Sequence, residues 1–120
     1  MVRILVIEDD NDLQFIYDKV LARLGHEITQ AKNASEAIIY LTTDDFGAIV
    51  LDMNMPDAPG TKILEIMKDD VRLRNIPVLV VSANEKFRTQ AQEFGAVYFM
   101  VKPVPLQDLT DAIQDVLKQK

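Results

Sequence analysis

Five polar residues stand directly after short apolar runs in this sequence. They are Glu8 and Asp9 after the first run, Asp52 after the third, Ser82 after the fourth and Lys102 after the fifth. If the runs are parallel strands of one sheet, their carboxyl ends meet at the same edge, where ligands bind in such folds. The pattern therefore predicts one site that combines three carboxylates with a hydroxyl and an ammonium group.

Three carboxylates in one crevice need a counter-charge, because like charges at ~4 Å and an effective dielectric near 20 repel by about 4 kcal/mol. One lysine cannot balance three acids. The chain has no cysteine and a single histidine, His26, so a thiolate or histidine-based metal site is excluded. An oxygen-only site with few fixed ligands favours Mg²⁺, which binds one or two carboxylates together with phosphate oxygens and water.

The acidic run also has a simpler interpretation, which is that it caps the helix that follows. Acids in a first helical turn contribute about 0.3–1 kcal/mol through the helix dipole. We assign that role to Asp10 or Asn11, and we assign Glu8 and Asp9 to the metal site.

Strand-like and helix-like patterns alternate along the whole chain, without a linker or an internal repeat. The predicted strands are 2–7, 26–31, 48–51, 78–81 and 97–101. Helical spacing predicts helices in between and at the end, and the inner face of the first comprises Leu13, Ile16, Tyr17, Val20, Leu21 and Leu24. Asn33 and Glu36 predict a capping box at the second helix. Uninterrupted β-branched strands between helices predict a parallel sheet covered on both faces.

Right-handed crossovers limit how five such units can be arranged. They favour an α/β, doubly wound, five-stranded parallel sheet of order 2-1-3-4-5, the flavodoxin-like (βα)5 fold, with its switch point between strands one and three. This order places Glu8 and Asp9 beside Asp52.

Length and charge limit the function classes. With 120 residues the chain is one domain, 1–120, and we expect no effector domain in it. Thirteen basic and nineteen acidic residues give a net charge of −6, which argues against direct nucleic-acid binding. No apolar run approaches the ~20 residues that span a bilayer, and no signal peptide is evident, so we expect a cytoplasmic protein without a membrane partner.

Four segments together resemble the response-regulator receiver domain of two-component signalling, in its chemotaxis-regulator-like form, over essentially the whole chain. "ILVIEDD" is similar to the family's acidic pair, and "VLDMNMPDAPG" to its phosphoacceptor loop, with Pro56 and Gly60 at the expected places. "VLVVSA" matches the hydroxyl position and "FMVKP" the Lys-Pro pair, here Lys102 and Pro103. Alone, each polar residue is more often a turn, a strand terminator or a surface cation; four matches in order reverse that expectation.

The resemblance implies a phosphorylation-dependent signalling switch rather than an enzyme. A phosphohistidine of a sensor histidine kinase or phosphotransfer protein in a phosphorelay would phosphorylate Asp52, giving an aspartyl phosphate. Mg²⁺ would be held by Asp9, Asp52 and the backbone carbonyl of Asn54, with Glu8 acting through a water molecule. Lys102 and Ser82 would contact phosphoryl oxygens. The resemblance also implies that the domain promotes only its own phosphorylation and dephosphorylation.

The resemblance also implies a readout. Closure of Ser82 on the phosphoryl group would let the switch aromatic, Phe99, rotate inward. This rotation would change the surface of the fourth helix, fifth strand and fifth helix. A downstream effector protein or domain would bind that surface. Side chains at Asn54 and Asn84 would tune hydrolysis. Val97 and Tyr98 replace an acidic pair that supports dimers in the DNA-binding branch, so we expect a monomer or weak dimer.

Two rival functions share this fold or chemistry. An aspartate-nucleophile phosphohydrolase of the haloacid-dehalogenase type needs a second aspartate where Asn54 stands. A flavodoxin-like FMN carrier needs a Ser/Thr/Gly-rich phosphate loop after the first strand, where this chain has an acidic run that repels phosphate. Both are therefore disfavoured by particular residues.

Overall fold

Strands and helices alternate through the computed structural model, which describes residues 2–55 and 57–118. The elements are β1 (Arg3–Ile7), α1 (Asn11–Ala22), β2 (Glu27–Ala31), α2 (Ala34–Thr43), β3 (Ala48–Asp52), α3 (Gly60–Asp69), β4 (Val78–Ser82), a 3-10 turn (Glu85–Phe87), α4 (Arg88–Glu93), β5 (Tyr98–Val101) and α5 (Leu106–Lys118). The predicted strands differ from these by one residue at some ends. None of the helices in the described ranges is long and apolar enough to cross a bilayer.

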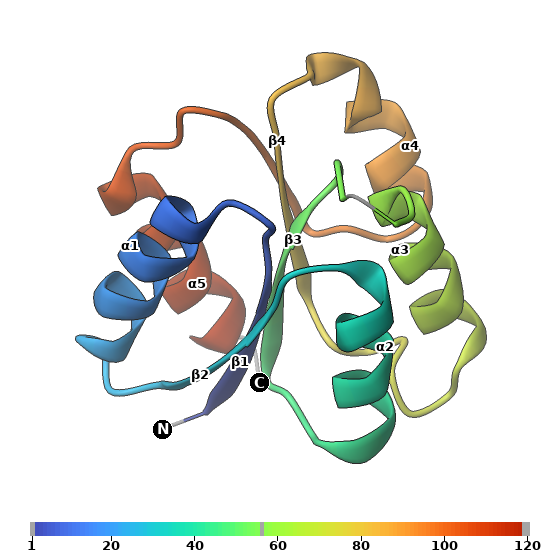
Figure 1. The fold of residues 1–120 in the computed structure, drawn as a ribbon, viewed down its shortest axis with the longest axis horizontal. Coiled ribbons are helices and arrows are strands. Elements are labelled where there is room, and N and C mark those ends of the chain that lie inside the picture. The colour runs from blue at the N-terminus through green and yellow to red at the C-terminus, as the bar shows by residue number, and fades with distance from the viewer. Residues whose placement is uncertain (1, 56, 119–120) are drawn as a thin grey trace.

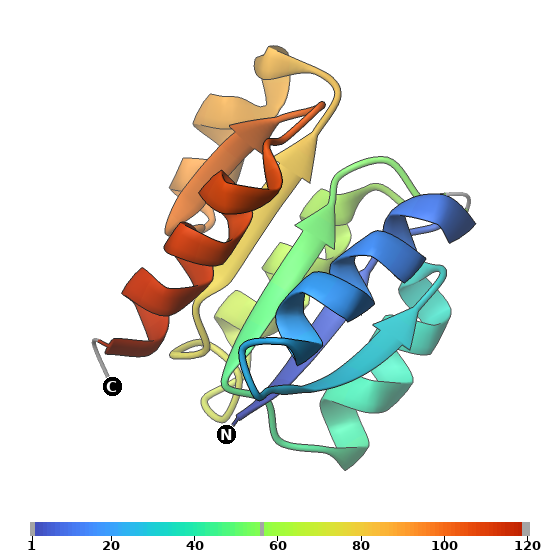
Figure 2. The same ribbon diagram turned by 90° about the vertical axis from the view of Figure 1, so that its left-hand side faces the viewer.

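The sheet is parallel and has the predicted order β2-β1-β3-β4-β5. The arrows of β3 (green) and β4 (yellow) point the same way in Figure 2. Ile7 lies opposite Leu51 in the pairing of β1 with β3. Glu8, which follows β1, therefore lies directly beside Asp52, the last residue of β3. The ends of β1 and β3 lie at the upper edge of the sheet in Figure 1.

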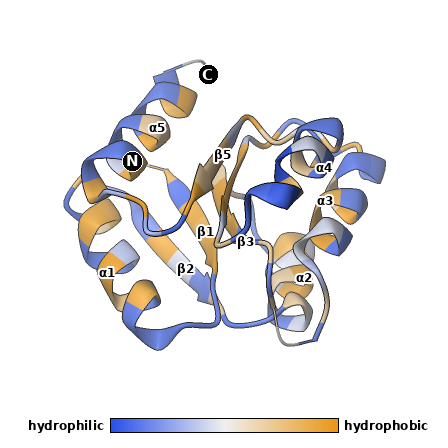
Figure 3. Ribbon diagram, turned by 90° about the horizontal axis from the view of Figure 1, so that it is seen from above, coloured by the Kyte–Doolittle hydropathy of each residue, from blue (hydrophilic) through white to orange (hydrophobic). Residues whose placement is uncertain are grey.

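Helices cover both faces of the sheet, with α1 and α5 on one side and α2, α3 and α4 on the other (Figure 3). Each face has its own apolar core. Residues of β1 alternate between the two: Leu5 and Ile7 belong to the core under α2 and α3, whereas Ile4 and Val6 belong to the core under α1 and α5. This alternation is expected of strands that are buried on both faces.

The inner face of α1 differs from the prediction at two positions. Tyr17 and Leu21 are buried as predicted, but Ile16 is 37% exposed and Gln14, which the apolar pattern omits, is only 3% exposed. The side chain of Gln14 donates hydrogen bonds to the carbonyl oxygens of Glu8 and Ala31. A polar side chain is buried here because backbone acceptors at the ends of β1 and β2 satisfy it.

The N-terminus of α2 is capped from two directions. Asn33 accepts a hydrogen bond from the Glu36 amide at 2.8 Å, as the predicted capping box requires, while the Glu36 carboxylate accepts from the Lys32 amide at 2.8 Å, one residue before the expected donor. Asp57, from the loop after β3, accepts from the amides of Ala34 at 2.8 Å and Ser35 at 3.0 Å. The free amides at this end of α2 are thus satisfied both by a neighbouring side chain, that of Asn33, and by one that is distant in sequence, that of Asp57.

We expect Asp57→Ala to destabilise the domain, because the amides of Ala34 and Ser35 lose their acceptor. These hydrogen bonds hold the pKa of Asp57 below its ordinary range. The stabilisation is therefore present above the unfolded-state pKa and is lost as pH falls through the lower folded-state value. Thermal melts at neutral and acidic pH should show a Tm difference from wild type that shrinks in acid. Asp45→Ala, at a largely exposed carboxylate, is the control; equal Tm losses in the two variants would contradict the capping role.

Candidate functional site

Three acidic side chains meet beyond the ends of β1 and β3. Carboxylate oxygens of Glu8, Asp9 and Asp52 all lie within 4.8 Å of one another. Glu8 and Asp52 are 2% and 4% exposed, whereas Asp9 is exposed to solvent. The sheet order alone accounts for this meeting, since β1 and β3 are adjacent. The cluster is therefore closed on the protein side and open to solvent at Asp9.

Lys102 brings positive charge to the cluster from the end of β5. Its Nζ lies 2.9 Å from Glu8 Oε1 and 3.5 Å from Asp52 Oδ2. The Lys102 amide donates to the carbonyl oxygen of Ser82 at 2.8 Å, which ties the end of β5 to the end of β4. The ammonium group thus bridges the two buried acids.

The charges of this cluster shift one another's protonation. Burial raises the pKa of Glu8 to about 7; the hydrogen bond from Lys102 partly opposes this rise and the charge of Asp52 adds to it. Burial tends to lower the pKa of Lys102, but the hydrogen bond to Glu8 and the charge of Asp52 outweigh it and raise that pKa. Near neutral pH, the lysine therefore stays charged while Glu8 is close to its titration point.

The backbone around Glu8 is held firmly. Its amide donates to the carbonyl of Ala31 at 3.0 Å, and its carboxylate Oε2 accepts from the Asp10 amide at 3.2 Å. Gln14 donates to its carbonyl. Apolar periodicity gave no reason to select Gln14, although its spacing from Tyr17 and Leu21 places it on the same helical face.

The loop after β3 closes tightly around Asp52. Asp52 Oδ1 accepts from the Asn54 amide at 3.2 Å, and the Gly60 amide donates to the Met53 carbonyl at 2.8 Å. A Cβ at Gly60 would lie 2.7 Å from the Met53 Cα, so only glycine fits where α3 begins against this loop. Pro56, which also contributes to the family resemblance, lies outside the described residues.

Ser82 is fully buried and its hydroxyl is engaged by its own loop. Ser82 Oγ donates to the carbonyl oxygen of Asn84 at 3.2 Å and accepts from the Asn84 amide at 3.0 Å. The contact of this hydroxyl with a phosphoryl oxygen stays a prediction. The residue is therefore placed to link the site with the β4–α4 loop.

Phe99 on β5 is 8% exposed and belongs to the core between the sheet and α2, α3 and α4. The guanidinium carbon of Arg88 lies 4.8 Å from the centre of its ring. The ring is thus buried while Ser82 is still held by its loop. Inward rotation of Phe99 on phosphorylation stays a prediction. Nothing in the sequence spacing of Arg88 predicts this contact with Phe99.

The acidic cluster suits a divalent cation. Its donors are carboxylate oxygens, which hard cations such as Mg²⁺ prefer, and the exposed Asp9 leaves one side open to water. Among residues 2–55 and 57–118, one ammonium group, that of Lys102, pairs with the cluster, so net negative charge is left when all three acids are ionised. The backbone carbonyl of Asn54 stays a predicted ligand.

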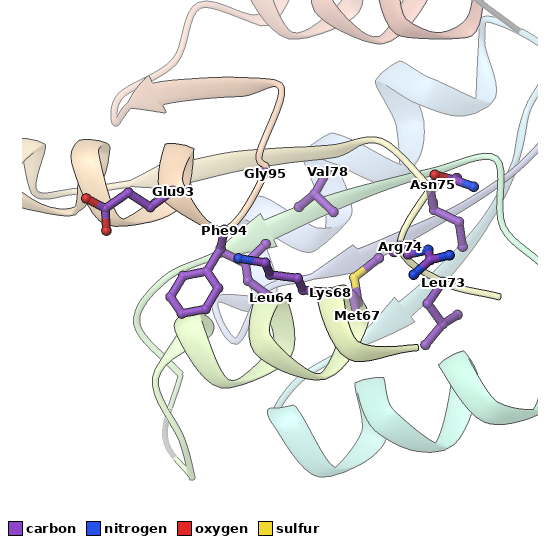
Figure 4. A pocket seen from close by; sticks show the side chains of 11 residues that line it. Leu64, Met67, Lys68, Leu73, Arg74, Asn75, Val78, Glu93, Phe94 and Gly95 are labelled. Carbon is purple, nitrogen blue, oxygen red and sulfur yellow. The ribbon is translucent and has the colours of Figure 1, made fainter. Parts of the chain in front are cut away.

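Several grooves lie on the surface of the described residues, and two of them bear on this cluster in different ways. One, of about 520 Å³, is lined by Lys102 and by mainly apolar residues: Leu13, Ile16, Tyr17, Pro103, Val104 and Leu106. The other, of about 380 Å³, lies between α3 and α4 and is shown in Figure 4, where Lys68 lies beside the Phe94 ring. No member of the acidic cluster lines the second groove, so the groove that shares Lys102 is the one connected with the site.

Comparisons with known proteins agree on one family. A family model described as the response regulator receiver domain matches residues 4–114. The chain is 31% identical to the chemotaxis protein CheY of Pseudomonas aeruginosa, over 98% of this chain and 97% of that protein. It is 30% identical to the two-component response regulator ORR24 of Oryza sativa over 98% of this chain, but it spans only 19% of that protein's length.

The fold is also that of solved receiver structures. The response regulator TrrA of Thermotoga maritima, crystallised in complex with Mg²⁺ and BeF, superposes with a TM-score of 0.88 at 22% identity, covering 98% of this chain and 100% of that one. At this identity, the similarity shows the fold alone. It agrees with the five parallel strands and their order.

We expect the affinity for Mg²⁺ to rise with pH. Glu8, with a pKa of about 7, is mostly protonated in mild acid, and the proton competes with the cation for the cluster. Below that pKa the dissociation constant should increase by up to about tenfold per pH unit lost. Calorimetric titrations across this range, with Glu8→Gln as comparison and the exposed Glu65→Gln as control, measure the slope. If the dissociation constant of wild type changed with pH as little as that of Glu8→Gln, the assignment of Glu8 to the metal site would be contradicted.

Proposed function

This chain belongs to the response regulator receiver domain family of two-component signalling, and we propose that it is a phosphorylation-dependent switch whose phosphoacceptor is Asp52. One observation carries the proposal. The Asp52 carboxylate, 4% exposed, lies with two other acids within 4.8 Å and 3.5 Å from the Lys102 ammonium. Acceptor, metal ligands and cation thus converge from separate strands.

In the proposed reaction an Asp52 carboxylate oxygen attacks the phosphorus of a phosphohistidine. The new P–O bond forms as the P–N bond breaks, and the imidazole leaves as the nitrogen base. Mg²⁺, when bound by Asp9 and Asp52 with Glu8 acting through water, supplies positive charge that reduces repulsion between the acids and the incoming group. A complex of Mg²⁺ and BeF with the structurally similar TrrA supports this choice of metal.

Lys102 has a partner to exchange in this reaction. In the structure its ammonium group bonds Glu8 at 2.9 Å and lies 3.5 Å from Asp52. A phosphoryl oxygen on Asp52 would draw the ammonium from Glu8, while the hydroxyl of Ser82 would leave Asn84 to donate to another oxygen. These groups contribute positioning and charge, which phosphoryl transfer chiefly requires.

The domain is proposed to have no other substrate. Hydrolysis of its own aspartyl phosphate resets the switch, and the phosphoryl group acts by favouring one of two conformations. The proposed output surface comprises α4, β5 and α5, which an effector protein or domain would bind. Phe99, in β5, lies behind this surface.

The phosphodonor is proposed to be a sensor histidine kinase or phosphotransfer protein that lies along the apolar groove beside Lys102. Ile16 and Leu106 line this groove and are 37% and 44% exposed. A protein that rests there lies beside Lys102, whose ammonium group contacts Glu8 and Asp52. A small phosphodonor needs no such contact.

We expect Asp52→Asn to abolish phosphorylation by acetyl phosphate in the presence of Mg²⁺, because the amide cannot form the acyl phosphate. Intact mass spectrometry measures the added phosphoryl group. Asp69→Asn, at the exposed last residue of α3, is the matched control and should still be labelled. Full labelling of Asp52→Asn would overturn the assignment of the acceptor.

Ile16→Ser should slow transfer from a protein donor and leave acetyl phosphate labelling unchanged. The donor is whichever kinase or phosphotransfer protein in a panel labels wild type fastest. We expect kcat/KM for this transfer to fall by about tenfold, the change that ~1.4 kcal/mol of lost contact produces. Ile39→Ser, at a 61% exposed residue of α2, is the control. Equal rates in both variants would exclude the groove as the docking site.

A further inference from the structure

We infer that Glu85 and Arg88 form a positioning pair that holds the Phe99 ring buried and so sets how strongly the domain responds to a phosphoryl group. The inference rests on the proposed function and adds two residues to it.

The geometry of the pair is specific. Arg88 Nε and Nη2 donate to the two carboxylate oxygens of Glu85, at 2.5 Å and 3.0 Å. Two parallel hydrogen bonds of this kind orient the guanidinium plane as well as its charge. The oriented group lies over Phe99, with its central carbon 4.8 Å from the ring centre, within the range of cation–π attraction.

The pair is also connected to the site through the backbone. Asn84, which holds the Ser82 hydroxyl on both its donor and acceptor sides, directly precedes Glu85. The Asn84 side chain accepts from the Lys86 amide at 2.9 Å and so caps the 3-10 turn that carries Glu85. The turn that carries Glu85 is therefore joined directly to the residue that Ser82 would release for a phosphoryl oxygen.

The exposure of the two side chains indicates that the pair contributes little to the free energy of unfolding of the domain. The side chains of Arg88 and Glu85 are 42% and 61% exposed, and ion pairs this exposed contribute little to global stability. Phe99, in contrast, is 8% exposed, and turning it outward would expose aromatic surface to water. The pair therefore acts on the balance between two positions of one ring rather than on unfolding.

The direction of the effect follows from linkage. In the proposed switch, the phosphoryl group favours the state in which Phe99 is inward, and the pair favours a buried Phe99 before any phosphoryl group is present. Removing the pair must then lower the affinity for a phosphoryl analogue by the factor by which the buried state loses population.

The chain offers a matched control on the same turn. Lys86 is also a cation, and its Nζ lies 5.3 Å from the ring centre of Phe87. Lys86→Ala, like Arg88→Ala, removes one positive charge and a long side chain from the same region of the surface. It leaves the guanidinium group of Arg88 over the Phe99 ring. Arg88→Lys keeps the charge and loses the two parallel hydrogen bonds.

The experiment places 4-fluorophenylalanine at position 99 of the full chain and records ¹⁹F spectra during titration with beryllofluoride and Mg²⁺. In Arg88→Ala, the solvent-exposed signal should increase without ligand, and the apparent dissociation constant of beryllofluoride should rise by about two- to fivefold, the range expected of an exposed cation–π contact. Glu85→Gln and Arg88→Lys should give smaller changes in the same direction. Lys86→Ala should match wild type.

The outcomes distinguish this inference from the proposed function. Equal ¹⁹F spectra and equal affinities in Arg88→Ala and Lys86→Ala, or tighter binding in Arg88→Ala, would overturn the positioning role. If Arg88→Ala does not fold, Glu85→Gln carries the same test. Failure of wild type to bind beryllofluoride would count against the proposed function, whereas the ligand-free spectra would still decide whether the pair keeps Phe99 buried.

Discussion

The structure depends on keeping three carboxylates together at one edge of the sheet. Glu8 and Asp52 are almost completely buried, and Lys102, which bonds Glu8 at 2.9 Å, is the cation that bridges them. Burial raises the pKa of Glu8 to about 7, so part of the repulsion is relieved by a proton when no metal ion is bound. The cluster thereby favours any ligand that brings positive charge, and Lys102 is available to a negative group that enters with it.

Loops with defined hydrogen bonds surround this cluster. Asp52 accepts from the Asn54 amide, and Asp57 fastens the same loop to the start of α2. On the other side, Asn84 engages the hydroxyl of Ser82 and caps the following turn. The first loop is thus anchored to a neighbouring helix, whereas the second is held mainly by local bonds to the serine. In the proposed switch, this difference makes the β4–α4 loop the part that a phosphoryl group would displace at low cost.

The route from site to surface is short. Ser82 contacts Asn84, Glu85 follows it in sequence, and Arg88 connects Glu85 with the ring of Phe99. Each step is a hydrogen bond, a covalent link or a stacking contact, so a change at the hydroxyl reaches the surface of α4 and β5 without repacking the core. Receiver domains of this family occur in proteins of very different length. This chain covers 97% of the length of a chemotaxis protein but only 19% of the length of a plant response regulator.

Hydrophobic periodicity and strand-end residues were sufficient to predict the sheet order and the meeting of Glu8, Asp9 and Asp52, because these follow from chain order and crossover handedness. Tertiary structure alone decided contacts between side chains that are distant in sequence or unrelated to any period. Gln14 is buried because β1 and β2 end with carbonyl groups that need donors, and Arg88 covers Phe99 because β5 passes under the first turn of α4. Such partners depend on positions in space, which local patterns do not encode.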